Sequence, residues 1–303
     1  MFAHLFAHGV CKMRPVRTAT AIPEAILTLD VEDWEHANFA QLHSYKDQIR
    51  TEVRARRYAM DSNTDTWIHL LGESGATSTC FVLGEFAQRY PDAVKRLAQA
   101  GHEIGSHGAT HDLIHRMTHI QFREFLKKGL GTIGDLTGHV PRGFRAPSWS
   151  VDPVRTPWFA EELALQNVHY DSSLFPVKTP LFGQGSAPLS PFWEGSLLRV
   201  PVSVLSFGSL RIPFASGAFF RLCPLWLIEA GLMRAIRQGL PAMIVLHPRE
   251  LDPLHPRLPL RGWEKSVHYA RLETTIPKLR RLLSRFRWRS VLEHYGNLIG
   301  RSL

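Results

Sequence analysis

The chain has 303 residues, of which 44% are hydrophobic and 21% are charged. This composition is typical of a globular protein with a sizeable core and excludes a largely disordered chain. Lys and Arg outnumber Asp and Glu by 36 to 27, and the net charge of +9 favours contact with anionic material such as acidic glycans, membrane surfaces or nucleic acid. The three cysteines, which form no CxxC pair, indicate neither a disulfide framework nor a cysteine-rich zinc site.

The first residues do not have the layout of a secretory signal. They are apolar only as far as Cys11, and their basic residues follow the apolar part instead of preceding it. No apolar run approaches the roughly 18 residues that a spanning helix needs. We therefore expect a cytoplasmic protein in which a poorly ordered N-terminal extension, residues 1–24, precedes one large domain, residues 25–303.

Seven short runs with strand character follow in chain order, and helical patterns separate them. Such alternation is typical of a parallel sheet or barrel, and seven strands would nearly close a barrel. The expected strands are residues 25–31, 78–84, 102–106, 142–146, 168–172, 197–202 and 242–247.

Two of the helical patterns have clear ends. Residues 90–101 carry Pro91 in the first turn and stop at Gly101. The next helix begins at Thr118, whose spacing to Gln121 predicts a capping box, and runs to Gly138. Residues 173–196 are rich in Pro, Gly and Ser and predict a long loop over one face.

The basic tail, residues 277–295, carries leucines at helical spacing among six Lys and Arg residues. This pattern predicts an amphipathic C-terminal helix. Such a helix can lie on an anionic membrane or bind a polyanion. Alternatively, it packs on the domain and leaves its arginines in solvent.

Polar residues that could do chemistry follow the ends of the predicted strands. His107 and His111 lie four positions apart, a spacing compatible with a metal site but weak on its own. Gly108 excludes the HExxH class of zinc proteases, which needs Glu at that position. The other strand ends carry a larger set, which we expect to meet at one edge of the sheet: Asp30, Glu32, Asp33, Arg145, Asp171 and His247.

Taken in order, these motifs resemble the polysaccharide deacetylases of the NodB-homology type, carbohydrate esterase family 4. That family has an aspartate pair, then H-[ST]-x-x-x-H, R-x-P-[YFW], an aspartate motif and L-x-H. This chain has TLDVED, SHGATH, RAPSW, YDSS and VLHP in the same order. From about residue 25 onward, longer segments such as LHPRELDP are similar to the subgroup associated with exopolysaccharide and exosortase gene clusters.

The resemblance implies an α/β fold, a single distorted (β/α)7 barrel that includes the C-terminal amphipathic helix. It also implies a hydrolase that uses a divalent metal, usually zinc, to remove N-acetyl groups from the amino sugars of a polysaccharide or of its lipid-linked precursor. His107 and His111 would be metal ligands, and a carboxylate would be the third. Asp30 matches the family's base and His247 its acid.

Two further roles follow from the same resemblance. Asp171 would hold His247 charged and oriented, and Arg145 would pair with Asp30. The third ligand is open: strand alternation puts Glu32 on the side of Asp30, whereas Asp33 keeps the aspartate that the family uses. We expect Asp33.

Other functions fit the same residues. A different amide hydrolase, such as a deformylase of a lipid-linked amino sugar, would need the same groups. A non-catalytic glycan-binding relative would have lost the base or the acid, and both are present. No nucleic-acid-binding motif occurs, so we expect a glycan or lipid-linked sugar as partner, with a peripheral association at the inner membrane face through the basic tail.

Overall fold

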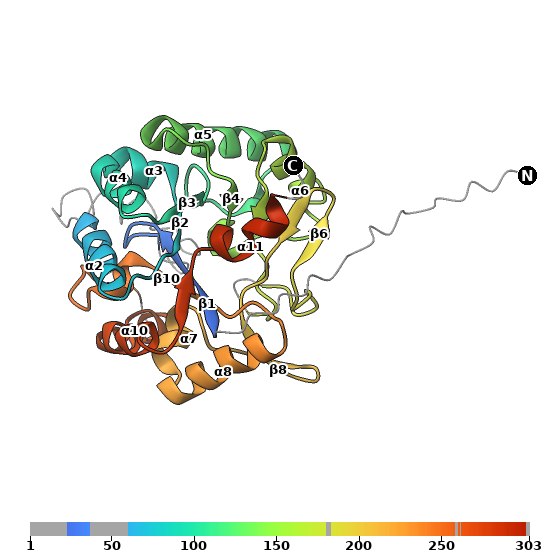
Figure 1. Ribbon diagram of the computed structural model, residues 1–303. Helices are drawn as coiled ribbons and strands as arrows, with labels where there is room; N and C mark the ends of the chain where they lie inside the picture. Colours follow the sequence, from blue (N-terminus) through green and yellow to red (C-terminus); the bar gives the residue numbers. More distant parts are fainter. Residues whose placement is uncertain (1–22, 37–59, 180–182, 258–259, 261, 301–303) are drawn as a thin grey trace, which may run out of the picture.

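The computed structural model describes residues 23–36, 60–179, 183–257, 260 and 262–300. Strands and helices alternate along the chain, as the sequence predicts (Figure 1). The strands are β1 (Glu24–Val31), β2 (Thr79–Val82), β3 (Glu103–Ser106), β4 (Gly143–Phe144), β5 (Tyr170–Asp171), β6 (Phe192–Glu194), β7 (Leu197–Arg199), β8 (Val204–Phe207), β9 (Leu210–Pro213), β10 (Met243–Leu246) and β11 (Arg287–Arg289). The helices are α2 (Asp61–Gly72), α3 (Gly84–Arg89), α4 (Pro91–Gln99), α5 (His119–Thr137), α6 (Phe159–Leu165), α7 (Gly217–Leu222), α8 (Leu225–Arg237), α9 (Gly262–Tyr269), α10 (Thr275–Leu283) and α11 (Val291–Ile299).

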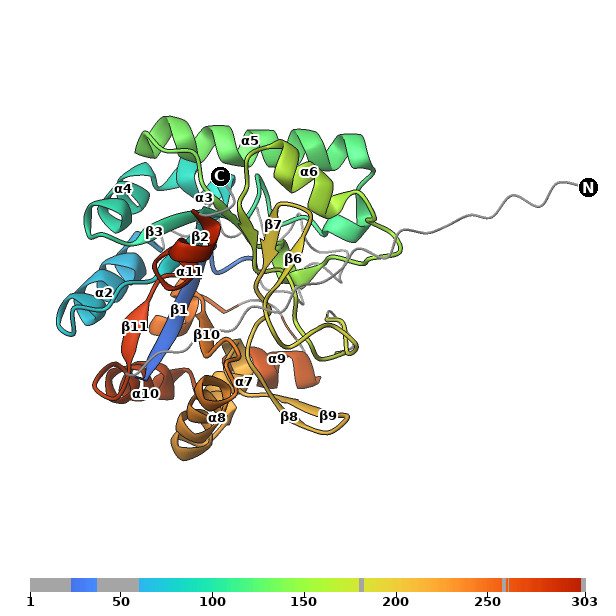
Figure 2. The same cartoon turned by 45° about the vertical axis from the view of Figure 1, so that its right-hand side comes forward.

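One curled sheet organises the molecule. Its order is β10-β1-β2-β3-β4-β5-β7-β6, in which β6 alone is antiparallel to its neighbour, and β11 is an additional parallel partner of β1. The parallel strands end at one edge, where the helices and loops that follow them begin (Figures 1 and 2). In the described part of the chain, β10 and β6 do not pair, so the sheet is a half-barrel open between them.

All seven strands expected from the sequence are present in this sheet, which confirms the α/β class. The expected barrel count of seven is not what the described residues show, because β6 and β11 also join the sheet and β8 and β9 form a separate hairpin. Three of the additional strands, β6, β9 and β11, are short and carry charged residues, as in the RWR sequence of β11. They therefore lack the apolar runs by which strands are recognised. Residues 1–22 of the expected N-terminal extension lie outside the described residues, and Glu24 already belongs to β1.

Alternation along β1 decides which of its side chains reach the inside of the curl. Leu27 and Leu29 pack outward into the main core, together with side chains of α2, α4, α8 and α10. Ile26 packs into a different cluster on the inner face, with Phe81 and Val245. Because successive side chains of a strand point to opposite faces, Thr28 and Asp30 share the inner face with Ile26.

Both well-delimited helices form as predicted. Pro91 occupies the first turn of α4, and Gly101 beyond its end has a φ of 84°. Thr118 caps α5 in a capping box with Gln121, and Gly138 ends that helix in the left-handed conformation. The segment 173–196, expected as a long loop, has no helix or strand in its described residues up to 191, but it also contains β6, which the sequence did not predict.

The prediction of one amphipathic C-terminal helix is wrong. The basic stretch divides into α10, which ends at Leu283, the strand β11, and α11. Trp288 is the cause, because its indole is buried and its nitrogen donates to the carbonyl oxygen of Leu282 at 3.0 Å. It alternates with two arginines, which is a strand pattern. The apolar side chains expected to meet a membrane are buried inside the protein: Leu279, Leu282, Leu283 and Phe286.

None of the helices in the described ranges is both long enough and apolar enough to cross a membrane.

Candidate active site

Asp30 and Arg145 form a buried ion pair on the inner face of the sheet. The Nη1 atom of Arg145 donates to Oδ1 of Asp30 at 2.6 Å and to Oγ1 of Thr28 at 2.8 Å. The guanidinium also bonds Ser172 and lies over the ring of Phe81, 4.3 Å from its centroid. These contacts fix the orientation of the Asp30 carboxylate, as the sequence predicted for this pair.

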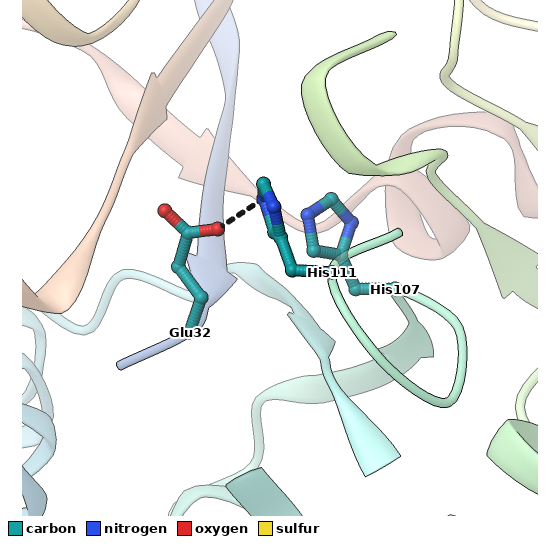
Figure 3. A group of neighbouring side chains, drawn as sticks. All are labelled: Glu32, His107 and His111. Carbon is teal, nitrogen blue, oxygen red and sulfur yellow. Dashed lines mark ion pairs between the residues drawn. The ribbon is translucent and has the colours of Figure 1, made fainter. Parts of the chain in front are cut away.

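Glu32, His107 and His111 form a group of neighbouring side chains (Figure 3). One ligand atom from each lies within 4.8 Å of the other two, and all three side chains are buried. Oε2 of Glu32 is 2.7 Å from Nε2 of His111. Two imidazoles and one carboxylate are the donor set of catalytic zinc sites that keep a position open for water or substrate.

Neighbouring groups orient the two histidines. Nδ1 of His107 lies 2.7 Å from the carbonyl oxygen of Arg145, so donation to that oxygen leaves Nε2 unprotonated for a metal. The backbone N–H of His111 donates to Glu85, whose carboxylate also pairs with His36, and the ring of His36 stacks on His111. Burial lowers the pKa of His107 to about 4, which keeps this imidazole in the neutral form that binds metals.

Glu32 has the environment of a ligand that lacks its cation. Its Oε2 atom is buried, and apart from the 2.7 Å contact with Nε2 of His111 it has no hydrogen-bond partner within the described residues. Burial opposes its ionisation, but the imidazoles of His111 and His247 outweigh this and hold the pKa of the Glu32 carboxyl below its usual range. The group is therefore an anion that faces two histidines.

Asp33, which we expected as the third ligand, lies elsewhere. Its Oδ2 accepts from Arg89 at 2.7 Å and from the hydroxyl of Tyr90 at 3.3 Å, and its Oδ1 accepts from the N–H of Trp34 at 2.9 Å. Alternation along the chain places it opposite Glu32, and it joins neither histidine in the described site. The geometry thus favours Glu32.

His247 follows β10 and faces the same centre. Its Nε2 is 3.7 Å from Oε1 of Glu32, and its Nδ1 is 3.0 Å from Oε2 of Glu250. Burial acts to lower the pKa of His247, but the two carboxylates prevail and raise it above the usual value. Glu250 also pairs with Arg221 at 2.8 Å. The imidazole is therefore held in place and favoured in its protonated form.

Asp171, expected to orient His247, has a different role. It bonds Arg199 at 2.9 Å and accepts from both the N–H and the hydroxyl of Ser173. The register of β5 and β7 pairs Asp171 with Arg199, so these two side chains meet. The partner that the sequence interpretation missed, Glu250, carried one usable signal: it lies three residues after His247 in HPRE, where its carboxylate also accepts the N–H of His247.

Gly108 lies in the loop between the two histidines, and its substitution tests how tightly this loop is packed. Its φ is 91°, and a Cβ there would lie 2.0 Å from the ring of Phe125. We expect Gly108→Ala to lower the free energy of unfolding by about 3 kcal/mol or more, because it adds overpacking to backbone strain. Gly101→Ala is the matched control, since its φ is 84° but its Cβ would meet nothing within 4 Å. It should cost only about 1 kcal/mol. Equal losses in denaturant titrations would contradict the packing argument.

The comparisons with known proteins agree with this geometry. Residues 34–167 match the family model of polysaccharide deacetylases, and residues 172–295 match a domain of unknown function, DUF3473. Residues 34–167 are therefore similar to polysaccharide deacetylases.

Two curated relatives of this family are similar over shorter segments. A peptidoglycan deacetylase of Helicobacter pylori is 34% identical over 97 residues, which is 32% of each chain. A peptidoglycan-N-acetylglucosamine deacetylase of Bacillus cereus is 29% identical over 92 residues, 30% of this chain and 34% of that one. The similarity thus spans about a third of each curated relative.

The fold is similar over a longer range. A crystal structure from Mycobacterium smegmatis, of a protein classed among the polysaccharide deacetylases, superposes with a TM-score of 0.60. The superposition covers 96% of both chains at 19% sequence identity. The half-barrel sheet is therefore the fold of a solved relative.

Proposed function

We propose that this chain is a metal-dependent hydrolase that removes N-acetyl groups from the amino sugars of a polysaccharide or of its lipid-linked precursor. One observation carries the proposal: Glu32, His107 and His111 gather beside the Asp30–Arg145 pair, and His247 faces the same carboxylate. Relatives named as peptidoglycan deacetylases support an N-acetylated glycan as the substrate class. The association with exopolysaccharide gene clusters and the cytoplasmic location remain predictions.

The three side chains fit a divalent metal. Glu32 offers a buried anionic oxygen whose neighbour in the described structure is the imidazole of His111, and His107 has its second nitrogen committed to a carbonyl oxygen. When bound there, a divalent cation, with zinc favoured by this donor set, would polarise the acetyl carbonyl and acidify a water molecule.

The remaining residues divide the proton transfers between them. Asp30 takes a proton from the attacking water, whose oxygen forms a new bond to the acetyl carbon. The bond from that carbon to the sugar nitrogen breaks, and His247 gives a proton to the departing amine, so that acetate and a free amino sugar are released. Arg145 and Glu250 position the base and the acid, at 2.6 Å and 3.0 Å.

Acetate release from N-acetylglucosamine oligomers tests the proposal. The purified protein should release acetate, lose at least about 99% of this activity after metal is removed with a chelator, and regain it when zinc is added, because the carbonyl must be polarised for attack. N-formylated glucosamine, assayed in parallel, separates the deformylase alternative, which predicts formate release instead. Undiminished acetate release from protein verified to be metal-free would refute the metal-dependent mechanism. Glycan binding without release of either acid would favour the non-catalytic alternative.

A further inference from the structure

Three buried basic side chains follow His247 in the chain and have no place in the proposed reaction. Arg249 belongs to the short 3₁₀ helix η4 (Pro248–Leu251), His255 follows it, and His268 lies in α9. Their exposed fractions are 7%, 1% and 3%. All three follow β10, at the edge of the sheet where the candidate active site lies.

Each of the three has at least one buried polar atom without a hydrogen-bond partner in the described residues. Within the described residues, no hydrogen-bond acceptor meets Nε or Nη1 of Arg249, and no partner meets Nε2 of His255 or of His268. The neighbouring buried arginine, Arg221, is different: it donates to Glu250 and to the carbonyl oxygens of Val267 and Ala270. The guanidinium of Arg221 thus has hydrogen-bond acceptors, whereas two nitrogens of the Arg249 guanidinium have none in the described residues.

The three side chains form one cluster. The rings of His255 and His268 meet edge to face with centroids 6.1 Å apart, and both rings pack on Tyr269. Burial lowers the pKa of His255 to about 4 and that of His268 well below its usual value, and Arg249 is the charge that lowers both further. Arg249 therefore acts directly on the two imidazoles.

An uncompensated buried guanidinium is unfavourable, because the charge has left water and gained no anion. The carboxylate of Glu250 does not fill this role, since His247 and Arg221 already engage it. The metal-type cluster of the described structure consists of Glu32, His107 and His111, and at the second group the positive charge of Arg249 would oppose a metal. The partner that would complement these three side chains is an anion with several oxygens that accept hydrogen bonds.

We propose that Arg249, His255 and His268 form a binding site for an oxyanion of the phosphate type. The guanidinium supplies the charge and two N–H groups, and the imidazoles supply the walls and further polar contacts. Because Arg249 lies two residues after His247, an oxyanion carried by the substrate would anchor the sugar beside the proposed acid. This part rests on the proposed function, whereas the binding of free inorganic phosphate does not.

Inorganic phosphate, titrated into the metal-loaded protein, tests the site. We expect phosphate to raise the Tm of the wild type and to bind with heat detectable by calorimetry. Arg249→Met should weaken this binding about 30-fold or more, because the buried counter-charge is lost. Arg257→Gln, which removes an exposed charge close to the same ring of Tyr269, is the matched control and should leave phosphate affinity unchanged.

Other outcomes overturn the proposal. If phosphate does not change the Tm of the wild type, and Arg249→Met raises the Tm in the absence of phosphate, the guanidinium is an unpaired structural charge. If phosphate binds Arg249→Met as tightly as the wild type, the anion binds elsewhere, for example at the metal. Neither result depends on deacetylation, so failure of the proposed function can be told apart from failure of the anion site.

Kinetics then identify the source of the oxyanion. If the substrate carries it, Arg249→Met should raise KM about 30-fold or more for a phosphorylated N-acetylamino sugar and leave KM for neutral oligomers unchanged. If a free anion fills the site, KM should be unchanged for both substrates, although phosphate binding is lost.

Discussion

Replacing Asp30 with Asn should reduce acetate release about 10²- to 10⁴-fold, the range by which a positioned general base accelerates reactions. The amide keeps the size of the side chain and can still accept the Arg145 hydrogen bond seen at 2.6 Å, but it cannot take a proton from water. The measurement is kcat/KM on N-acetylglucosamine oligomers.

Metal content and Tm of Asp30→Asn provide the controls. Both should match the wild type, because the cluster of Glu32, His107 and His111 does not include Asp30. A variant that is folded, metal-loaded and as fast as the wild type would show that another group activates the water. A loss of metal would instead mean that Asp30 is a ligand.

The second large effect is expected at Glu32. Glu32→Gln should weaken zinc affinity about 100-fold or more and reduce activity accordingly, since it removes the anionic member of the ligand set. Asp33→Asn is the matched control: it changes one carboxylate to an amide one residue away, in a side chain held by Arg89 and Tyr90. Zinc affinity of that variant should be unchanged.

Competition with a chromophoric chelator measures both affinities. The pair is informative because the two substitutions remove the same charge from adjacent positions. Metal loss in Asp33→Asn, with metal retained in Glu32→Gln, would place the third ligand at Asp33 and would require the segment after β1 to rearrange.

Several candidate residues could be expected from the sequence to lie together, because the last residues of parallel strands lie at the same edge of the sheet. Asp30, Arg145 and His247 lie at the ends of expected strands, His107 and His111 follow one, and the structure brings these side chains close together. The expectation of Asp33 as third ligand followed the residue type that the family prefers, whereas the geometry favours Glu32. The alternation along β1, visible in the sequence, pointed to Glu32.

The partner of His247 could not be predicted in the same way. Asp171 and His247 both end strands, but which carboxylate reaches an imidazole depends on strand order and register. Register joins Asp171 to Arg199, and a turn of η4 brings Glu250 back to His247. Only the HPRE spacing hinted at this short-range contact.

Helix prediction succeeded where local signals agreed and failed where tertiary pairing prevailed. The caps of α4 and α5 are encoded by Pro91, Thr118 and Gly138 and need no distant contact. The basic tail has a helical leucine pattern, yet β11 interrupts it because its residues find a strand partner in β1. That partner lies more than 250 residues earlier in the chain, and the sequence of the tail contains no pattern that indicates the pairing.

Because β11 pairs with β1, the strand that carries Asp30 gains one of its partners only from a late part of the chain. Glu24–Ile26 of β1 bind β11, while Thr28–Val31 of the same strand bind β2 and lead to Asp30. Val291 and Leu292, just after β11, also donate their N–H groups to Thr79 in β2 and Glu103 in β3. The edge of β1 at Glu24–Ile26 therefore finds its partner only after residues 287–289 have been made and released for pairing, and until then this edge stays open to mispairing.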